Sequence, residues 1–230
     1  MLNLHGYGES ILNGAVITIE VALLSLVLSM ILGIGTALAR LSKSRIAQGI
    51  AIVYTTVIRG IPDLVLMLLI FFGGQILVNE LAYMVGYEDY IDINPFVAGV
   101  LTIGFIFGAY MAETFRGAIL SVDDGQLEAG RAYGMTSFQV FRRILFPQMM
   151  RHALPGFGNN WLVLLKTTAL VSIIGLDDMV RTASLAAGST QKPFTFYLTV
   201  SVIFLIFTSI SVAYLQWLER RYSASLRREA

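Results

Sequence analysis

The sequence predicts an all-α membrane protein with five transmembrane helices. Of its 230 residues, 56% are hydrophobic and 13% are charged, and the charged fraction is about half that of an ordinary soluble domain. The apolar residues also gather in five stretches, each long enough to cross a bilayer as a helix. We therefore interpret residues 1–230 as a single transmembrane domain.

The expected spans follow one another at residues 11–39, 50–78, 96–120, 154–176 and 194–218. The first span lacks a positively charged leader and is too long for the apolar core of a signal peptide, so we expect it to be retained. The second is interrupted by RGIPD, where Pro62 removes a backbone hydrogen bond and Gly60 loosens the helix. A broken membrane helix is tolerated where it lines protein or water, so this segment is a candidate pathway element.

The distribution of basic residues predicts the orientation of the chain. Lys and Arg follow the first span, follow the third span and occupy the C-terminal tail: Arg40, Lys43, Arg45, Arg116, Arg131, Arg142, Arg143, Arg151, Arg220, Arg221, Arg227 and Arg228. Residues 1–10 and 79–94 contain none. Because cytoplasmic loops are enriched in Lys and Arg, we expect the N-terminus outside and the C-terminus in the cytoplasm.

Charged residues inside the spans are candidates for a substrate pathway or gate, because inserting a charge costs about 2.5–3.5 kcal/mol. Arg59 and Asp63 are four residues apart and would pair on one helix face. They form either a gate or an ion pair that fixes the kink. Glu113 and Arg116 either meet the charged groups of a substrate or satisfy each other at a helix end.

Three further positions extend this set. Tyr110 precedes Glu113 by about one turn and either stacks on a cation or packs. Lys166 lies in the middle of the fourth span and would face a subunit interface or the pathway. Asp177 and Asp178, together with the acidic residues of 79–94, predict an acidic outer face that attracts cations or docks a partner.

Several chemistries are not expected. The chain has no cysteine, and its two histidines, His5 and His152, lie far apart, so neither a disulfide nor a metal site is predicted. No catalytic constellation or phosphate loop is present, so we do not expect an enzyme. A net charge of +1 gives no indication of nucleic acid binding.

The longest predicted cytoplasmic loop, about 121–147, reads as two short helices joined at Gly134. Asp123 with Gln126 and Thr136 with Gln139 have the spacing of capping boxes. Gly134 suits the left-handed position that ends a helix. The pattern therefore predicts a polar helical hairpin between the third and fourth spans.

Pro147 is expected to break the second helix at its far end. Glu128 lies at the start of the first helix, and Ala129 and Gly130 leave its surface bare for the close approach of another protein. An amphipathic loop on the membrane surface is one alternative. A helix-turn-helix that reads DNA is another, and the nearby membrane spans disfavour it.

The stretch EAGRAYGMTSFQVFRRILFP at 128–147 resembles the EAA loop of ABC importer permeases. In that pattern Glu-Ala-Ala is followed after three residues by Gly, and after nine more by Ile-x-Leu-Pro. The matching residues are Glu128, Ala129, Gly134, Ile144 and Pro147, whereas Gly130 replaces the second Ala and Phe146 replaces Leu. The stretches IRGIPDLVLMLLIFF, GAYMAETFRGAI and LPGFGNNWLVLLKTTALVSIIGLDD are similar to polar amino acid permeases, particularly the histidine/lysine/arginine/ornithine and octopine/nopaline type.

This resemblance implies a type I ABC importer permease in the bacterial inner membrane, carrying basic amino acids or opines by alternating access. It implies a second permease subunit (a related chain or a second copy), two ATPase subunits that bind ATP and Mg²⁺, and a periplasmic or extracellular solute-binding protein. The chain itself would bind no cofactor. The implied ATPase-coupling residues are Glu128, Ala129, Gly130, Tyr133, Gly134, Ile144 and Pro147.

Two other functions remain open. An ion-coupled secondary amino acid transporter would use Glu113 and Asp63 as carriers, and its transport would follow the proton gradient without an ATPase. A membrane scaffold would tolerate replacement of either carboxylate. The spacing of the EAA-like residues favours the ABC permease.

Overall fold

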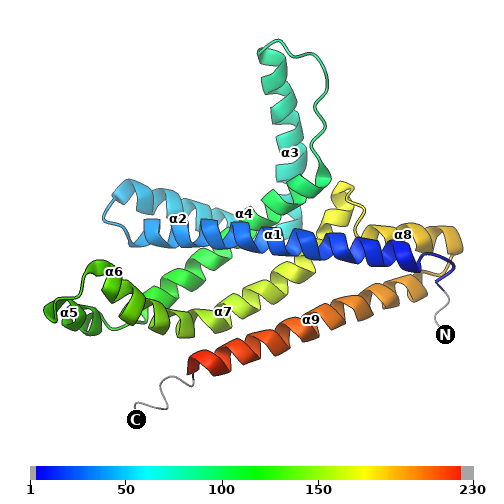
Figure 1. Ribbon diagram of the computed structural model, residues 1–230. Helices are drawn as coiled ribbons and strands as arrows, with labels where there is room; N and C mark the ends of the chain where they lie inside the picture. The colour runs from blue at the N-terminus through cyan, green and yellow to red at the C-terminus, as the bar shows by residue number, and fades with distance from the viewer. Residues whose placement is uncertain (1–3, 224–230) are drawn as a thin grey trace.

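The computed structural model describes residues 4–223, and every regular element in that range is a helix (Figure 1). Arg227 and Arg228, counted above among the cytoplasmic basic residues, lie outside the described residues. Five helical stretches are long and apolar enough to cross a membrane, which confirms the predicted number. They are α1 (Gly8–Leu41), α3 (Asp63–Met84), α4 (Pro95–Leu120), the helical run Ser137–Ile174, and Pro193–Tyr222 within α9 (Pro193–Ser223).

The second predicted span was wrong in its extent, because residues 50–78 form parts of two helices. α2 (Arg45–Gly60) has 16 residues and is not among the membrane-crossing helices. Ile61 is extended, as a residue before proline prefers to be, and Pro62 has no N–H to continue the ladder. α3 then starts at Asp63. The predicted break therefore separates an accessory helix from the span itself.

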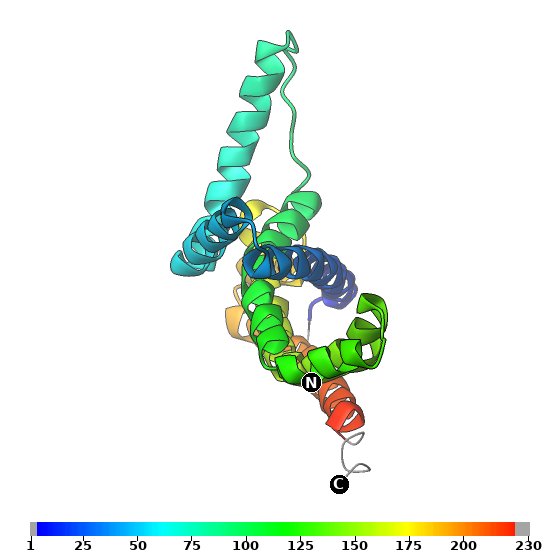
Figure 2. The same ribbon diagram turned by 90° about the vertical axis from the view of Figure 1, so that its left-hand side faces the viewer.

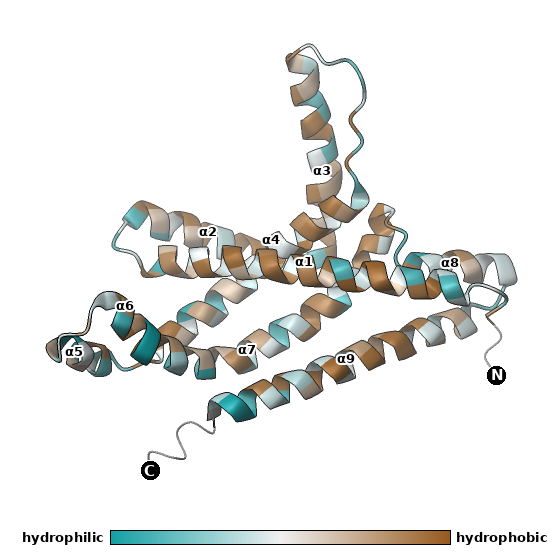
Figure 3. Cartoon of the chain, viewed as in Figure 1, coloured by the Kyte–Doolittle hydropathy of each residue, from teal (hydrophilic) through white to brown (hydrophobic). Residues whose placement is uncertain are grey.

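Several polar segments lie together at one end of the helix bundle. In Figure 1 the loop between α1 and α2, the helices α5 (Asp124–Ala132) and α6 (Ser137–Val140), and the C-terminal end of α9 lie at one end, and α8 (Met179–Thr190) lies at the other. In Figure 3 most residues along α1 and α9 are brown, which marks hydrophobic residues, and teal, hydrophilic residues lie around α6. In both ribbon views α3 projects away from the bundle (Figure 2).

The centre of the body is the contact between α1 and α4, where glycines let the two helices approach closely. Leu28 and Leu32 of α1 lie over Gly104 and Gly108 of α4. The two α4 glycines form a small-xxx-small pattern of the kind that mediates close packing of membrane helices. We expect this contact to behave as a rigid unit.

The buried core continues from this contact into α7 (Phe146–Thr167). Fully buried Ile106 and Phe107 of α4 belong to the same cluster as Val21 of α1 and Leu164 and Leu165 of α7. Beyond α7 the chain tightens into the 3₁₀ helix η2 (Thr168–Ile174) and ends in a left-handed Gly175. The fourth membrane-crossing stretch, Ser137–Ile174, is longer than the predicted span 154–176, because its helical run begins well before Leu154.

Candidate functional site: an intramembrane charge cluster and a polar hairpin

The break between α2 and α3 brings three predicted pathway residues together. The guanidinium carbon of Arg59 lies 5.6 Å from the centroid of the Tyr110 ring. The Tyr110 hydroxyl lies 3.5 Å from Oδ1 of Asp63, to which it donates a long hydrogen bond. The predicted direct pairing of Arg59 with Asp63 was wrong: no salt bridge joins them among the described residues. The helix ends between them, and Tyr110 contacts both.

A second cluster lies about one turn further along α4. Arg116 donates through Nη2 to Oε2 of Glu113 at 3.0 Å, as predicted for a pair three residues apart. Arg40, from the last turn of α1, donates to the other oxygen, Oε1, and lies 3.3 Å from Oγ1 of Thr55 on α2. Sequence reasoning counted Arg40 only as a basic loop residue. Arg40 lies within the apolar run that ends at Leu41, and this position could have indicated that it belongs to the helix.

The two clusters differ in what they can bind. Both carboxylate oxygens of Glu113 are occupied by arginines, and its side chain is 19% exposed. This arrangement ties α1 to α4, and two guanidinium groups already neutralise the Glu113 carboxylate that a cationic ligand would need. Asp63 accepts one hydrogen bond and is partly exposed at the start of α3, beside the Arg59 and Tyr110 pair. Asp63 therefore accepts fewer hydrogen bonds from the protein than Glu113 does.

Lys166 is at the end of α7 and not in the middle of a straight span, because the α-helix stops at Thr167. Its side chain is exposed, and no ion pair or hydrogen bond to it is formed within residues 4–223. One to two turns earlier, Asn160 donates to Oγ1 of Thr114 at 2.9 Å and links α7 to α4. Sequence reasoning missed this asparagine, and a polar side chain within an apolar span was the available signal.

The acidic outer face predicted from Asp177, Asp178 and residues 79–94 is not assembled within this chain. The connection to α8 and the end of α3 lie in different directions (Figure 1). Asp178 is fully buried and caps α8 by accepting from the Arg181 amide at 2.9 Å. Burial raises the pKa of Asp178 to about 6, and its Oδ2 has no hydrogen-bond partner among the described residues. Asp177 pairs with the Arg181 side chain at 2.8 Å.

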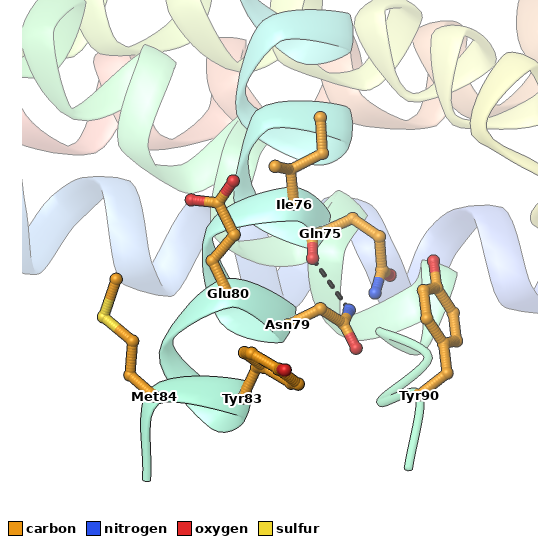
Figure 4. Close-up of a pocket in the computed structure, with 7 residues that line it drawn as sticks. All are labelled: Gln75, Ile76, Asn79, Glu80, Tyr83, Met84 and Tyr90. Carbon is orange, nitrogen blue, oxygen red and sulfur yellow. Dashed lines mark hydrogen bonds between the residues drawn. The ribbon is translucent and has the colours of Figure 1, made fainter. Parts of the chain in front are cut away.

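The projecting α3 is braced by the chain that follows it. Gln75 accepts from the Ile93 amide at 2.9 Å, and Asn79 accepts from the Ile91 amide at 2.8 Å. A shallow pocket of about 430 Å³ opens beside these side chains and is also lined by Glu80 (Figure 4). None of the predicted pathway residues lines it, so it is separate from the charge clusters.

The polar hairpin has the predicted caps in part. Thr136 and Gln139 form a capping box, with both reciprocal hydrogen bonds present. Asp123 caps α5, but it accepts from the Gly125 amide at 2.7 Å. The side chain of Gln126 instead accepts from Gln148 at 2.5 Å, so the first capping box is absent.

Gly134 joins the two helices as predicted. Its φ is +82°, in the left-handed region, and it follows the end of α5 at Ala132. The Met135 amide donates to the Gly130 carbonyl at 3.1 Å, and the Gly134 amide donates to the Arg131 carbonyl at 2.9 Å. These two bonds form a Schellman motif, which fixes the angle between the helices.

The two faces of α5 have different roles in the structure. Gly130 is buried, and a Cβ at this position would lie 2.6 Å from Cδ1 of Ile144 and 3.3 Å from Cγ2 of Val140. Its small size therefore serves the packing inside the hairpin. Glu128 and Ala129 are exposed, and Tyr133 is 88% exposed. Of the predicted coupling residues before Gly134, these last three are free to contact another protein.

Pro147 does not end the second helix, which corrects the sequence prediction. After α6 the chain forms a π-helical turn, η1 (Phe141–Leu145), and continues directly into α7. Pro147 lies directly after this π-helical turn, so its missing N–H falls where the regular α-helical hydrogen-bond ladder is already interrupted. The hairpin is thus continuous with the fourth span. No cluster of three or more His, Asp or Glu side chains suited to a metal occurs in residues 4–223.

Comparison with known proteins places the chain in a family. Residues 15–224 match the family model described as "Binding-protein-dependent transport system inner membrane component". The chain is 53% identical to the histidine/lysine/arginine/ornithine transport system permease protein HisQ of Escherichia coli (strain K12), over 98% of each chain. It is 41% identical to the octopine transport system permease protein OccQ of Rhizobium meliloti, over 97% of this chain and 94% of that one.

A solved structure has the same fold. The crystal structure of an amino acid ABC transporter with histidines contains a chain that is 32% identical, with a TM-score of 0.78. The match covers 94% of this chain and 95% of that chain. These relatives are transport subunits, as expected for a chain without a catalytic constellation. The chain belongs to the family of inner membrane components of binding-protein-dependent transport systems, that is, the permease subunits of ABC importers.

Proposed function

We propose that this permease carries basic amino acids, such as histidine, lysine, arginine and ornithine, or the related opines. The observation that carries this proposal is the similarity over nearly the whole chain to permeases for these compounds. Membership of the ABC permease family also decides against the ion-coupled transporter and the scaffold that the sequence left open. Transport would proceed by alternating access and be driven by ATP.

The polar hairpin would couple the permease to its ATPase. Glu128, Ala129 and Tyr133 present an exposed face on α5, and Gly134 sets the angle to the next helix. Ile144 supports α5 from beneath through Gly130, and Pro147 starts the span that follows. An exposed tyrosine next to small residues suits insertion into a groove on a partner protein. A rigid connection into α7 would transmit the movement of the ATPase to the membrane.

The assembly would contain a second permease subunit, two ATPase subunits that bind ATP and Mg²⁺, and a solute-binding protein. The second permease subunit would be either a related chain or a second copy. Lys166 supports this part of the proposal, because an exposed and unpaired cation next to an apolar span is unfavourable in lipid. A partner subunit or a water-filled pathway between subunits would provide the polar environment that it needs.

The proposed orientation places the hairpin in the cytoplasm and the N-terminus outside. The structure gathers the loop after α1, the hairpin and the C-terminal end of α9 at one end of the body (Figure 1). Arg45, Arg142 and Arg220 come from these three segments. The enrichment of basic residues at the cytoplasmic side supports this assignment.

Asp63 is the candidate group for a cationic substrate. It has no ion pair within the described residues, whereas Glu113 has two, and Tyr110 beside it offers an aromatic face that already contacts the guanidinium of Arg59. A substrate guanidinium or ammonium group would compete with Arg59 for this site. Asp63→Asn should therefore raise the KM for uptake with little change in thermal stability.

The substrate class can be tested with the reconstituted transporter. ATPase activity would be measured with the solute-binding protein and each of the twenty amino acids, and uptake would be followed with and without a protonophore. We expect stimulation by arginine, lysine, histidine or ornithine, and uptake that persists without a proton gradient. Stimulation confined to neutral or acidic amino acids would contradict the proposed substrate class.

The coupling role can be tested on exposed residues, whose replacement leaves the hairpin intact. Tyr133→Ala and Glu128→Lys should weaken binding of the ATPase roughly tenfold or more, the loss typical of a central interface residue. Tyr83→Ala at the end of α3 is a matched control, since Tyr83 is 73% exposed and lies far from the hairpin. Normal ATPase binding and uptake in both hairpin variants would exclude the assigned docking face.

A further inference from the structure

An open apolar groove runs along α2, between this helix and its neighbours α1 and α4. One part of the groove, about 410 Å³, lies between α1 and α2 and includes Gly35, Ala39 and Ala47. A second part, about 550 Å³, runs along α2 past Gly49 and Val57. The two parts meet at shared residues of α2 and α4, which are Ile50, Tyr54 and Phe105. The result is two adjoining apolar furrows with a common wall.

The furrows are open, and no side chain of residues 4–223 fills them. A Cβ added at Gly35 or at Gly49 would meet no atom within 4 Å. Ile50 is 68% exposed and Val53 is 62% exposed on the same helix. Because α2 is too short to be a membrane-crossing helix, these side chains line a recess beside the full-length spans. Two adjoining furrows of this kind suit the two acyl chains of one phospholipid.

The end of the groove near Ala39 and Ala47 is basic. Lys43 and Arg45 lie in and directly after the short connection between α1 and α2, and both are exposed. Neither forms a salt bridge within the described part of the chain. The connection is held in place because Gln48 donates to the Ser42 carbonyl at 2.6 Å and Ser44 caps α2. Two exposed cations that form no ion pair with the described residues therefore lie on the connection beside the Ala39 and Ala47 end of the groove.

We propose that this groove binds an anionic phospholipid, with its acyl chains in the two furrows and its headgroup phosphate between Lys43 and Arg45. The charge of Lys43 and Arg45 selects an anionic headgroup over a zwitterionic one, as basic pockets between membrane helices on the cytoplasmic side do. This site is independent of the substrate and of the coupling hairpin. It would brace α2, whose last turn holds Arg59 against Tyr110.

The absence of cysteine in this chain allows a direct test. Gly49→Cys would carry a small fluorophore in the assembled transporter, whose other subunits have been made cysteine-free. Vesicles that contain phosphatidylglycerol and phosphatidylcholine in equal amounts are compared, with either the first or the second lipid brominated. At about 1 kcal/mol for each basic residue, we expect up to roughly 30-fold preference for the anionic lipid in quenching. Lys43→Gln with Arg45→Gln should remove the preference, and Lys43→Arg with Arg45→Lys should keep it.

A matched control uses Leu205→Cys on α9, an exposed position in an apolar span, where both lipids should quench equally. Equal quenching of the Gly49 label by both lipids would mean ordinary boundary lipid and would overturn the proposal. Absence of quenching by either lipid would mean that a protein subunit covers the groove, and it would overturn the proposal as well. The labelled Gly49→Cys protein with Lys43 and Arg45 unchanged decides between these outcomes, even where a charge variant assembles poorly.

Discussion

Glu113→Gln removes the carboxylate that Arg40 and Arg116 share in this structure. The amide keeps the size of the side chain but not its charge, so two arginines from α1 and α4 are left near each other without a counter-ion. We expect the contact between these helices to weaken. Uptake should fall because less folded permease is present, and the KM of the folded fraction should change little.

The magnitude follows from the geometry of the ion pairs. At the 3.0 Å that separates Arg116 Nη2 from Glu113 Oε2, Coulomb's law with an effective dielectric constant of about 20 gives roughly 5 kcal/mol. Desolvation and partial exposure oppose this attraction, because the three side chains are 19–30% exposed. We therefore expect a net loss of about 2 kcal/mol, which corresponds to a decrease in Tm of about 4–8 °C.

A double-mutant cycle with Arg40→Gln separates the ion pair from other effects. The double variant keeps only Arg116 of the two arginines in this cluster. Its loss in free energy of unfolding should be about 1–2 kcal/mol smaller than the sum of the losses in the two single variants. Thermal unfolding in detergent and uptake in vesicles are measured together, with Glu80→Gln as an exposed control. Additive costs, or an unchanged Tm with a large rise in KM, would refute the reasoning and assign Glu113 to substrate binding.

Three further predictions concern other parts of the fold. Gly33→Ala should cost about 1–3 kcal/mol, because its Cβ would lie 2.5 Å from Cβ of Met111, whereas Gly35→Ala has open space and should be neutral or stabilising in thermal unfolding. Gly134→Val should lower ATPase coupling and destabilise the hairpin by about 1–2 kcal/mol, because the φ of Gly134 is +82° and a β-branched residue is strained there. Gly134→Asn should destabilise the hairpin less than Gly134→Val does. Equal ATPase stimulation in the two variants would contradict this explanation. Asp178 binds its proton more tightly when folded, with a pKa of about 6 against an ordinary 3.8, so stability should decrease by up to about 3 kcal/mol as pH rises from 4 to 7. Asp178→Asn should reduce that slope in Tm measured against pH, and an unchanged slope would exclude Asp178 as its source.

The features that could be predicted from the sequence have local causes. Pro62 lacks an N–H, and therefore the helix break appears wherever the rest of the chain lies. The capping box of Thr136 with Gln139 and the turn at Gly134 each involve only three or four neighbouring residues, and the structure contains both. The number of spans could be predicted for the same reason, because a stretch of about 20 apolar residues is a local property.

The features that could not be predicted depend on contacts between distant segments. Arg40 and Glu113 are 73 positions apart, and only the packing of α1 on α4 brings them together. Asp178 follows an exposed aspartate in sequence, yet its backbone lies against Gly14 of α1, where a Cβ would be 2.6 Å from the Met179 amide. The pairing of Arg59 with Asp63 failed because a helical spacing was applied across a helix end. In each case the type of residue indicated polarity and the fold decided the partner.

The order of elements along α4 connects the charge clusters to the hairpin. Tyr110 and Glu113 lie near the end of α4, and the helix ends at Leu120, immediately before α5 begins at Asp124. A force applied to α5 therefore enters α4 at the end where α4 packs on α7, and it reaches Glu113 before Tyr110. The ties that resist this force are the Glu113 ion pairs with Arg40 and Arg116 and, one turn further in, the contacts of Tyr110 with Arg59 and Asp63. Because Arg40 belongs to α1 and Asp63 starts α3, loss of these contacts would remove polar ties of α4 to both helices, while the close contact of α4 with α1 at Gly104 and Gly108 remains. The same residues that hold the resting arrangement are thus the ones that ATPase movement would have to separate.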